Sequence, residues 1–323
     1  MEMVKKWTNK ILDTPTWISV FAGIFLIAWQ WKTGSLPPSV QITFFALFIF
    51  LTGIPHGAID HLVEKETAKR LKKTFNMKFF LLKYVLTMLF YGFMWYLLPS
   101  VSLIFFLLIS AWHFGETDIE KAPQTPLWHM TRFICGCFTI LWILLLHAQE
   151  TTTILDRITQ NSQIVMALWM QAVEFKAPFL VLIILFFIPF YYTANQKNKI
   201  YLDKMRLIRL SLILISTYFL PLLPAFALYF GGWHALCSFQ TISQYLLKNK
   251  EKNDRTSSIH SAIQVWTKTL FFTFLALSGL AFGVWYWLHF LQNWDPLPLL
   301  FIFLSLITLP HLNVMHGMIK TTI

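Results

Sequence analysis

Long apolar runs alternate with short polar loops along the chain, and this pattern restricts the possible folds more than any other feature. A helix needs about 20 mostly apolar residues to cross the roughly 30 Å hydrocarbon core of a bilayer. Runs of this kind lie at 16–34, 39–60, 78–98, 101–119, 128–148, 174–193, 205–222, 224–247, 265–290 and 297–318. Only 13% of the 323 residues are charged, whereas soluble domains carry roughly 25%. The pattern predicts an all-α, polytopic transmembrane helical bundle of about ten helices, formed by a single integral membrane domain over residues 1–323.

Basic residues concentrate in alternate loops, which is the usual orientation signal of an inner-membrane protein. The clusters are Lys5, Lys6 and Lys10; Lys65, Lys69, Arg70, Lys72 and Lys73; Lys197, Lys199, Lys204, Arg206 and Arg209; and Lys248, Lys250, Lys252 and Arg255. All of them fall on one side if the chain crosses the membrane about ten times and both termini are cytoplasmic. The alternative is a count of eight or nine helices with re-entrant pieces. We therefore predict a multi-pass protein of the cell's inner (cytoplasmic) membrane. The net charge of +11 reflects this topology and does not indicate nucleic-acid binding.

Histidines interrupt the apolar runs in four short motifs. The motifs are GIPHGAIDH at 53–61, SAWHFGETD at 110–118, GGWHALCS at 231–238 and LPHLNVMH at 309–316. An imidazole within hydrocarbon costs free energy unless something satisfies it, so each is a candidate for a functional site. A metal ion is the natural shared partner of several neutral imidazoles. Because the four predicted helices run in the same direction, we expect one metal site in the membrane-embedded core, with His56, His113, His234 and His311 as ligands.

Carboxylates follow two of these histidines at helical spacing. Asp60 lies four residues after His56 and Glu116 three residues after His113, so each shares a helix face with its histidine. A carboxylate behind a ligating imidazole accepts its N–H and fixes its orientation, whether the imidazole is on the same helix or on another one. The residues predicted to surround the metal are Asp60, Glu116, Asp118, Ser238 and His316. Such a set suits iron that handles dioxygen in an apolar cavity. A hydrolytic zinc site would fit these ligands too, but it would need a polar pocket that water can reach.

The four motifs, in this order, resemble those of the Brp/Blh family of bacterial and archaeal membrane β-carotene 15,15′-dioxygenases. The matching segments are Gly53-Ile-Pro-His-Gly-Ala-Ile-Asp60, Ser110-Ala-Trp-His-Phe-Gly115, Ala227-Leu-Tyr-Phe230 leading to His234, and Leu309-Pro-His311. The resemblance implies a non-haem Fe(II) held by histidines, with which O₂ cleaves the central double bond of β-carotene. It also implies that the two retinal molecules produced serve a microbial rhodopsin. Carried over to this chain, the resemblance marks His56, His113 and His234 as iron ligands.

The third motif departs from the family pattern. Many members have His-x-x-Arg-His there, and the second histidine is a proposed ligand, whereas this chain has His234-Ala-Leu-Cys-Ser238. Three interpretations follow: His311 or His316 completes the ligand set, the iron has three protein ligands and an extra open position, or this member has a changed substrate or no activity.

Two other classes of function remain open from the residues alone. One is another metal-dependent membrane lipid oxidase or hydroxylase, although that class uses clustered histidines and the chain contains no His-His pair. The other is a transporter in which the histidines and the carboxylates of Asp60, Glu116 and Asp118 relay protons. A transporter would need a polar path open to water from both sides, and the outer halves of the predicted helices contain few ionisable groups.

Overall fold

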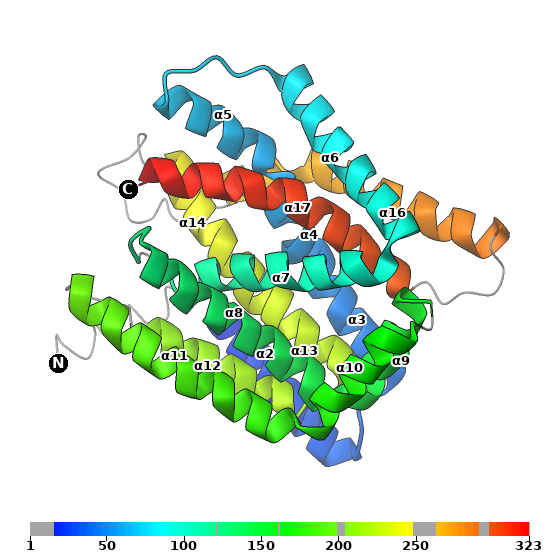
Figure 1. Ribbon diagram of the computed structural model, residues 1–323. Helices are drawn as coiled ribbons and strands as arrows, with labels where there is room; N and C mark the ends of the chain where they lie inside the picture. Colours follow the sequence, from blue (N-terminus) through cyan, green and yellow to red (C-terminus); the bar gives the residue numbers. More distant parts are fainter. Residues whose placement is uncertain are drawn as a thin grey trace. The chain divides into compact units, whose positions relative to one another are not determined.

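The computed structural model describes residues 16–120, 122–160, 162–198, 204–247, 263–290 and 297–322. These described residues form α-helices and two π-helical segments, and no strand occurs among them (Figure 1). The elements are α2 (Thr16–Thr33), α3 (Pro38–Phe48), η1 (Ile49–Gly53), α4 (Ile54–Ala58), α5 (Asp60–Arg70), α6 (Met77–Leu97), α7 (Pro99–Asp118), α8 (Pro126–Leu146), α9 (Ala148–Ile158), α10 (Gln163–Glu174), α11 (Lys176–Asn198), α12 (Lys204–Tyr218), α13 (Leu222–Ala227), η2 (Leu228–Ala235), α14 (Leu236–Leu247), α16 (Leu270–Phe290) and α17 (Leu297–Thr322).

Among the described residues, eight helical stretches are long and apolar enough to cross a membrane. They are Pro38–Arg70, Met77–Leu97, Pro99–Asp118, Pro126–Leu146, Lys176–Lys197, Leu222–Leu247, Leu270–Phe290 and Leu299–Thr321. The prediction of an all-helical, polytopic membrane protein is confirmed. The two remaining predicted runs, 16–34 and 205–222, form α2 and α12, which are 18 and 15 residues long and fall outside this set. The predicted basic clusters at 5–10 and 248–255 lie outside the described residues.

The helix boundaries follow from residues at their first turns. At the start of α6 the Asn76 side chain accepts a hydrogen bond from the Phe79 backbone N–H, and at the start of α8 the Thr125 side chain accepts one from the Trp128 N–H. Both contacts satisfy N–H groups that have no partner within the helix. Pro126 then occupies the first helical position, where its missing N–H costs nothing. The polar and proline residues of the short loops thus explain where the apolar helices begin.

Large apolar side chains cover the outward faces of several helices. Phe79 and Phe90 of α6 are 67% and 63% exposed, and Phe271 and Phe274 of α16 are 70% and 73% exposed. An exposed apolar surface of this extent is unusual for a soluble protein and is ordinary for a surface in contact with lipid.

The chain divides into two compact units, each of which has its own packed interior. Unit 1 comprises Met1–Gly53, Phe114–His147 and Ala177–Phe239, and unit 2 comprises Ile54–His113, Ala148–Lys176 and Gln240–Ile323. Within unit 1, α13 and η2 pack against α2, α3, η1 and α12. Within unit 2, α17 packs against α5, α6 and α9, and α16 packs against α4. The helices α7 and α14 each contribute residues to both units. The single domain over 1–323 stays a prediction.

Candidate metal centre

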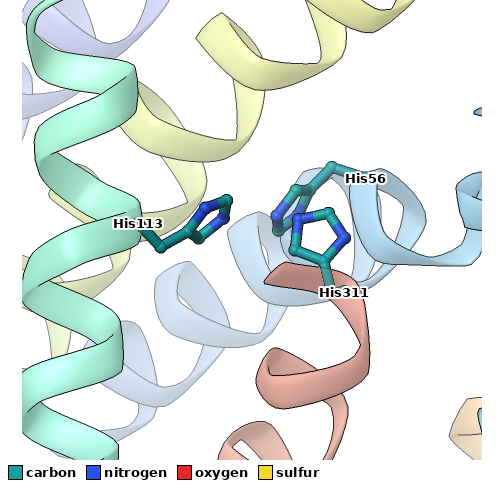
Figure 2. A group of neighbouring side chains, drawn as sticks. All are labelled: His56, His113 and His311. Carbon is teal, nitrogen blue, oxygen red and sulfur yellow. The ribbon is translucent and has the colours of Figure 1, made fainter. Parts of the chain in front are cut away.

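Three histidines from distant parts of the chain come together in unit 2. His56 lies on α4, His113 on α7 and His311 on α17, and each lies within one of the candidate membrane spans. One ring nitrogen of each lies within 4.8 Å of those of the other two, and all three side chains are buried. Figure 2 shows the three imidazoles directed toward one another. The ring centroid of His311 is 4.9 Å from that of His56 and 4.9 Å from that of His113.

A proline directly precedes two of these histidines. His56 follows Pro55 in the short helix α4, which begins directly after the π-helical segment η1 and ends before α5. His311 follows Pro310 inside α17. Proline lacks the N–H that an α-helix interior requires, and π-helical turns are frequent at functional sites. The Pro-His pairs therefore place an imidazole where the regular backbone hydrogen bonding is locally broken.

A carboxylate fixes the orientation of one imidazole. The Nδ1–H of His311 donates to Oδ1 of Asp60 at 2.7 Å, and both side chains are buried. The hydroxyl of Tyr84 donates to the other oxygen, Oδ2, at 3.1 Å. A histidine that donates through Nδ1 presents Nε2 to a metal, which is the arrangement of carboxylate–histidine–metal sites. The Nε2 of His311 is buried and has no hydrogen-bond partner among the described residues.

The donor set fits a transition metal. Three buried imidazoles offer neutral nitrogen ligands, which suit iron, zinc, copper and nickel, and one of them is already held by a carboxylate. Hard cations such as Mg²⁺ and Ca²⁺ prefer oxygen ligands. The three histidines could therefore hold a transition-metal ion.

Tyr84 was not predicted from the sequence. It lies on α6 in the predicted run 78–98, and its hydroxyl is also 3.5 Å from the Ile307 carbonyl oxygen. The only signal for it is a hydroxyl-bearing side chain within an apolar run. No spacing links it to Asp60, which is 24 residues away.

The predicted ligand His234 lies in unit 1. Its side chain is fully buried on η2, with ring centroids 4.7 Å from Phe114 and 5.8 Å from Phe230. His234 does not belong to the group formed by the other three histidines, and its role as a ligand stays a prediction. Ser238, at the position where many family members have histidine, is buried, and its hydroxyl lies 3.1 Å from the hydroxyl of Thr117 in the same unit.

The remaining predicted residues have different surroundings. Asp118 is fully buried in unit 1, where it accepts hydrogen bonds from Trp233 Nε1, from the Tyr229 hydroxyl and from the Thr139 hydroxyl. Glu116 is buried in the same unit, and His316 is half-buried on α17 in unit 2. Asp60 is a predicted surrounding residue that the structure places in direct contact with the three-histidine group, through its hydrogen bond from His311.

Comparison with known proteins gives one family. The model of the family described as beta-carotene 15,15'-dioxygenase matches residues 47–319, a range that includes all four predicted histidine ligands. A curated beta-carotene 15,15'-dioxygenase from an uncultured marine bacterium, 66A03, is 33% identical over 116 residues. That alignment covers 36% of this chain and 42% of the relative, so the match spans less than half of the relative's length. No solved structure matches.

Proposed function

The chain belongs to the beta-carotene 15,15'-dioxygenase family, and from this premise we propose that it cleaves β-carotene at the central 15,15′ double bond. One molecule of O₂ is consumed, the double bond breaks, and each of the two retinal molecules receives one oxygen atom. The observation that carries this proposal is the buried group of His56, His113 and His311 within candidate membrane spans. An enzyme whose reactive centre lies among membrane-spanning helices can receive an apolar substrate directly from the bilayer.

We propose Fe(II) as the metal and His56, His113 and His311 as the residues that hold it. Their proximity and burial support this assignment. When bound, the iron supplies the one-electron chemistry that O₂ needs in order to react with an alkene. Three imidazoles are neutral, so they leave the positive charge of the ion uncompensated within the site.

Asp60 and Tyr84 act through His311. The Asp60 carboxylate accepts the Nδ1–H of His311, which keeps Nε2 available and makes it a better electron donor. Tyr84 donates to the second carboxylate oxygen and holds the carboxylate plane in position. The surrounding apolar helices exclude water, which limits side reactions of activated oxygen.

We keep His234 as a proposed fourth ligand. Its full burial within a candidate membrane span supports this proposal, because polar residues at such positions often have functional roles. The expected effect of His234→Ala is loss of iron without loss of the fold. If iron content and affinity are unchanged, the site has three protein ligands.

The eight candidate spans show a multi-pass membrane protein. We propose that it lies in the inner (cytoplasmic) membrane with both termini on the cytoplasmic side, because the basic loops alternate with loops poor in Lys and Arg. A functional link to a microbial rhodopsin, which would use the retinal, stays a prediction. Transfer of retinal to an opsin in the same vesicle would test it.

The deciding experiment supplies membranes containing the protein with Fe(II), O₂ and β-carotene, and quantifies retinal by chromatography. We expect retinal that requires both oxygen and iron, and that is lost in the variants His56→Ala, His113→Ala and His311→Ala. The matched control is His289→Ala, because His289 is exposed on α16 and bonds its own helix backbone at Trp285. Intact β-carotene with folded protein would contradict the proposed substrate, and oxidation of another membrane lipid would indicate the oxidase or hydroxylase alternative.

A further inference from the structure

The helix α17, which carries His311, is divided by Pro310. Proline has no N–H, so one backbone hydrogen bond is missing directly before the histidine. The two halves of α17 are therefore coupled less firmly than the halves of a regular helix. The position of His311 depends on what fixes the second half, residues 311–322, within unit 2.

The first half of α17 is fixed to α6. Trp95 Nε1 donates a hydrogen bond to the Ser305 hydroxyl at 2.8 Å, and both side chains are buried. This contact lies before Pro310 in the chain. It therefore leaves the position of the residues after the proline to be determined by other contacts.

The second half of α17 packs against α5. His311 donates to Asp60 of α5 at 2.7 Å. Further along the same pair of helices, a Cβ on Gly317 would lie 3.8 Å from Cγ2 of Thr67. Residue numbers rise together along the two helices, so α5 and the second half of α17 run in the same direction.

Tyr245 of α14 joins these two helices at the end away from the histidine. Its hydroxyl lies 2.9 Å from the Thr67 hydroxyl and 2.7 Å from the Thr321 hydroxyl of α17. Thr321 in turn donates to the Met318 carbonyl oxygen at 2.9 Å. Because a hydroxyl has one proton to donate, Thr321 accepts from Tyr245, and Tyr245 accepts from Thr67. We call this directed series of bonds through the three hydroxyls the hydroxyl chain.

Arg70 of α5 holds Tyr245 itself in place. Its guanidinium carbon lies 3.8 Å from the centroid of the Tyr245 ring, and its Nη2 donates to the Tyr245 carbonyl oxygen at 2.6 Å. The Nε of Arg70 donates to Oε1 of Glu66, one turn back on α5, at 3.1 Å. The Tyr245 side chain is buried. Both the ring and the backbone of Tyr245 are thus tied to α5, so its hydroxyl is a fixed point for α17.

We propose that Tyr245 is a positioning residue for the metal centre. This inference rests on the proposed function, which assigns the metal to the three-histidine group. Through the hydroxyl chain, Tyr245 fixes the register of the second half of α17 against α5 and holds His311 opposite Asp60. Without the hydroxyl chain, the half of α17 beyond Pro310 can shift along α5, and Nε2 of His311 moves away from the other two imidazoles.

The first test removes hydroxyls and keeps side-chain shape. Tyr245→Phe retains the ring beside Arg70. Thr67→Val and Thr321→Val remove the other two hydroxyls, whereas Thr67→Ser and Thr321→Ser keep them. Tyr286→Phe is the matched control, because Tyr286 lies on α16 in the same unit and is 48% exposed. Each purified protein is titrated with Co(II), whose absorption spectrum reports the number and geometry of its ligands.

We expect Tyr245→Phe and the two valine variants to lower the Co(II) affinity about 2- to 10-fold, the equivalent of one neutral hydrogen bond. The serine variants and Tyr286→Phe should keep the wild-type affinity and spectrum. Wild-type affinity in Tyr245→Phe would overturn the inference. If Tyr245→Phe does not fold, wild-type affinity in both valine variants would do so.

A double variant separates positioning from general loosening. Substitutions that lie far apart and share no partner normally have additive effects. Tyr245→Phe and Asp60→Asn should instead be non-additive in Co(II) affinity, since both act through the contact between Asp60 and His311. Additive effects would show that Tyr245 acts elsewhere and would overturn the inference.

The last measurement is made on metal-free protein. Spin labels at Lys69→Cys of α5 and Lys320→Cys of α17, both at exposed positions, report the distance between the two helices in protein whose native cysteines have been replaced. We expect one narrow distance distribution, which broadens in Tyr245→Phe; an unchanged distribution would overturn the inference. Neither the titration nor the distance depends on cleavage, so failure to cleave β-carotene would contradict the proposed function without affecting this test.

Discussion

Replacing Asp60 by Asn removes the charge behind His311 and leaves the shape of the side chain nearly unchanged. The amide oxygen can still accept the Nδ1–H of His311, now at 2.7 Å from the carboxylate, and the amide nitrogen can donate to the Tyr84 oxygen. The variant therefore isolates the contribution of the negative charge to the metal site. Tyr84→Phe makes the complementary change, because it keeps the charge and removes one hydrogen bond.

The expected size of the effect follows from the buried hydrogen bond. A bond to a charged group contributes about 1.5–3 kcal/mol and a neutral one about 0.5–1.5 kcal/mol. The centres of these two ranges differ by roughly 1.25 kcal/mol, which corresponds to about eightfold in Fe(II) affinity and lies close to the low end of the 10- to 100-fold losses typical when the partner of a metal ligand is changed. The hydrogen bond from Tyr84 is long for a carboxylate acceptor, at 3.1 Å. We therefore expect Tyr84→Phe to lower the Fe(II) affinity by less than about fivefold.

The assay is anaerobic titration of the purified protein with Fe(II) against a competing chelator, followed by measurement of retinal formation. Affinity should fall in the order wild type, Tyr84→Phe, Asp60→Asn, His311→Ala. Glu64→Gln is the control, since Glu64 is a partly exposed carboxylate one turn further along α5. Wild-type affinity in Asp60→Asn, together with loss in His311→Ala, would refute the claim that the carboxylate acts on the metal through His311.

Three further outcomes are expected. His311→Ala loses bound iron measured by elemental analysis, whereas His316→Ala keeps it, because only His311 belongs to the three-histidine group. Gly115→Ala lowers the thermal unfolding temperature in detergent, because its Cβ would overlap a backbone carbonyl of α8, whereas Gly57→Ala, with open space at its Cβ, leaves it nearly unchanged. Asp118→Ala leaves buried donors without their acceptor and lowers stability by about 3 kcal/mol or more, measured by denaturant unfolding; an unchanged midpoint would contradict its anchoring role.

The sequence predicted much of the fold, because hydrophobic thickness fixes helix length almost independently of tertiary contacts. The predicted runs recur as helices, with α2 and α12 as the ones that fall outside the set of eight candidate spans. Both helices fall outside the set because of polar residues near their ends. The last turn of α2 contains Gln30 and Lys32, and the described part of α12 begins with Lys204. A few polar residues at the end of a helix therefore decide whether it is long and apolar enough to be a candidate span.

The candidate site could be predicted in part. The Pro-His motifs indicated His56 and His311 before any contact was known, and Asp60 was expected behind an imidazole of its own or another helix. The structure gives the second alternative, with His311 separated from Asp60 by 251 residues. A hydroxyl within an apolar run was the only sequence signal for Tyr84, and the π-helical segments had none, since both depend on how helices meet in space. Asp118, predicted among the carboxylates around the metal, accepts hydrogen bonds from Thr139, Tyr229 and Trp233, and its role beside the metal stays a prediction.

The separation of Asp60 from His311 has a consequence for biosynthesis. At about 5–20 residues per second, the ribosome needs roughly 10–50 s to add the 251 residues between them. During this interval the carboxylate enters the membrane without the imidazole that it later holds. The three-histidine group is complete only after His311 of α17 has been added, so the candidate metal site cannot form before that step. Delivery of the proposed iron must therefore follow the insertion of α17.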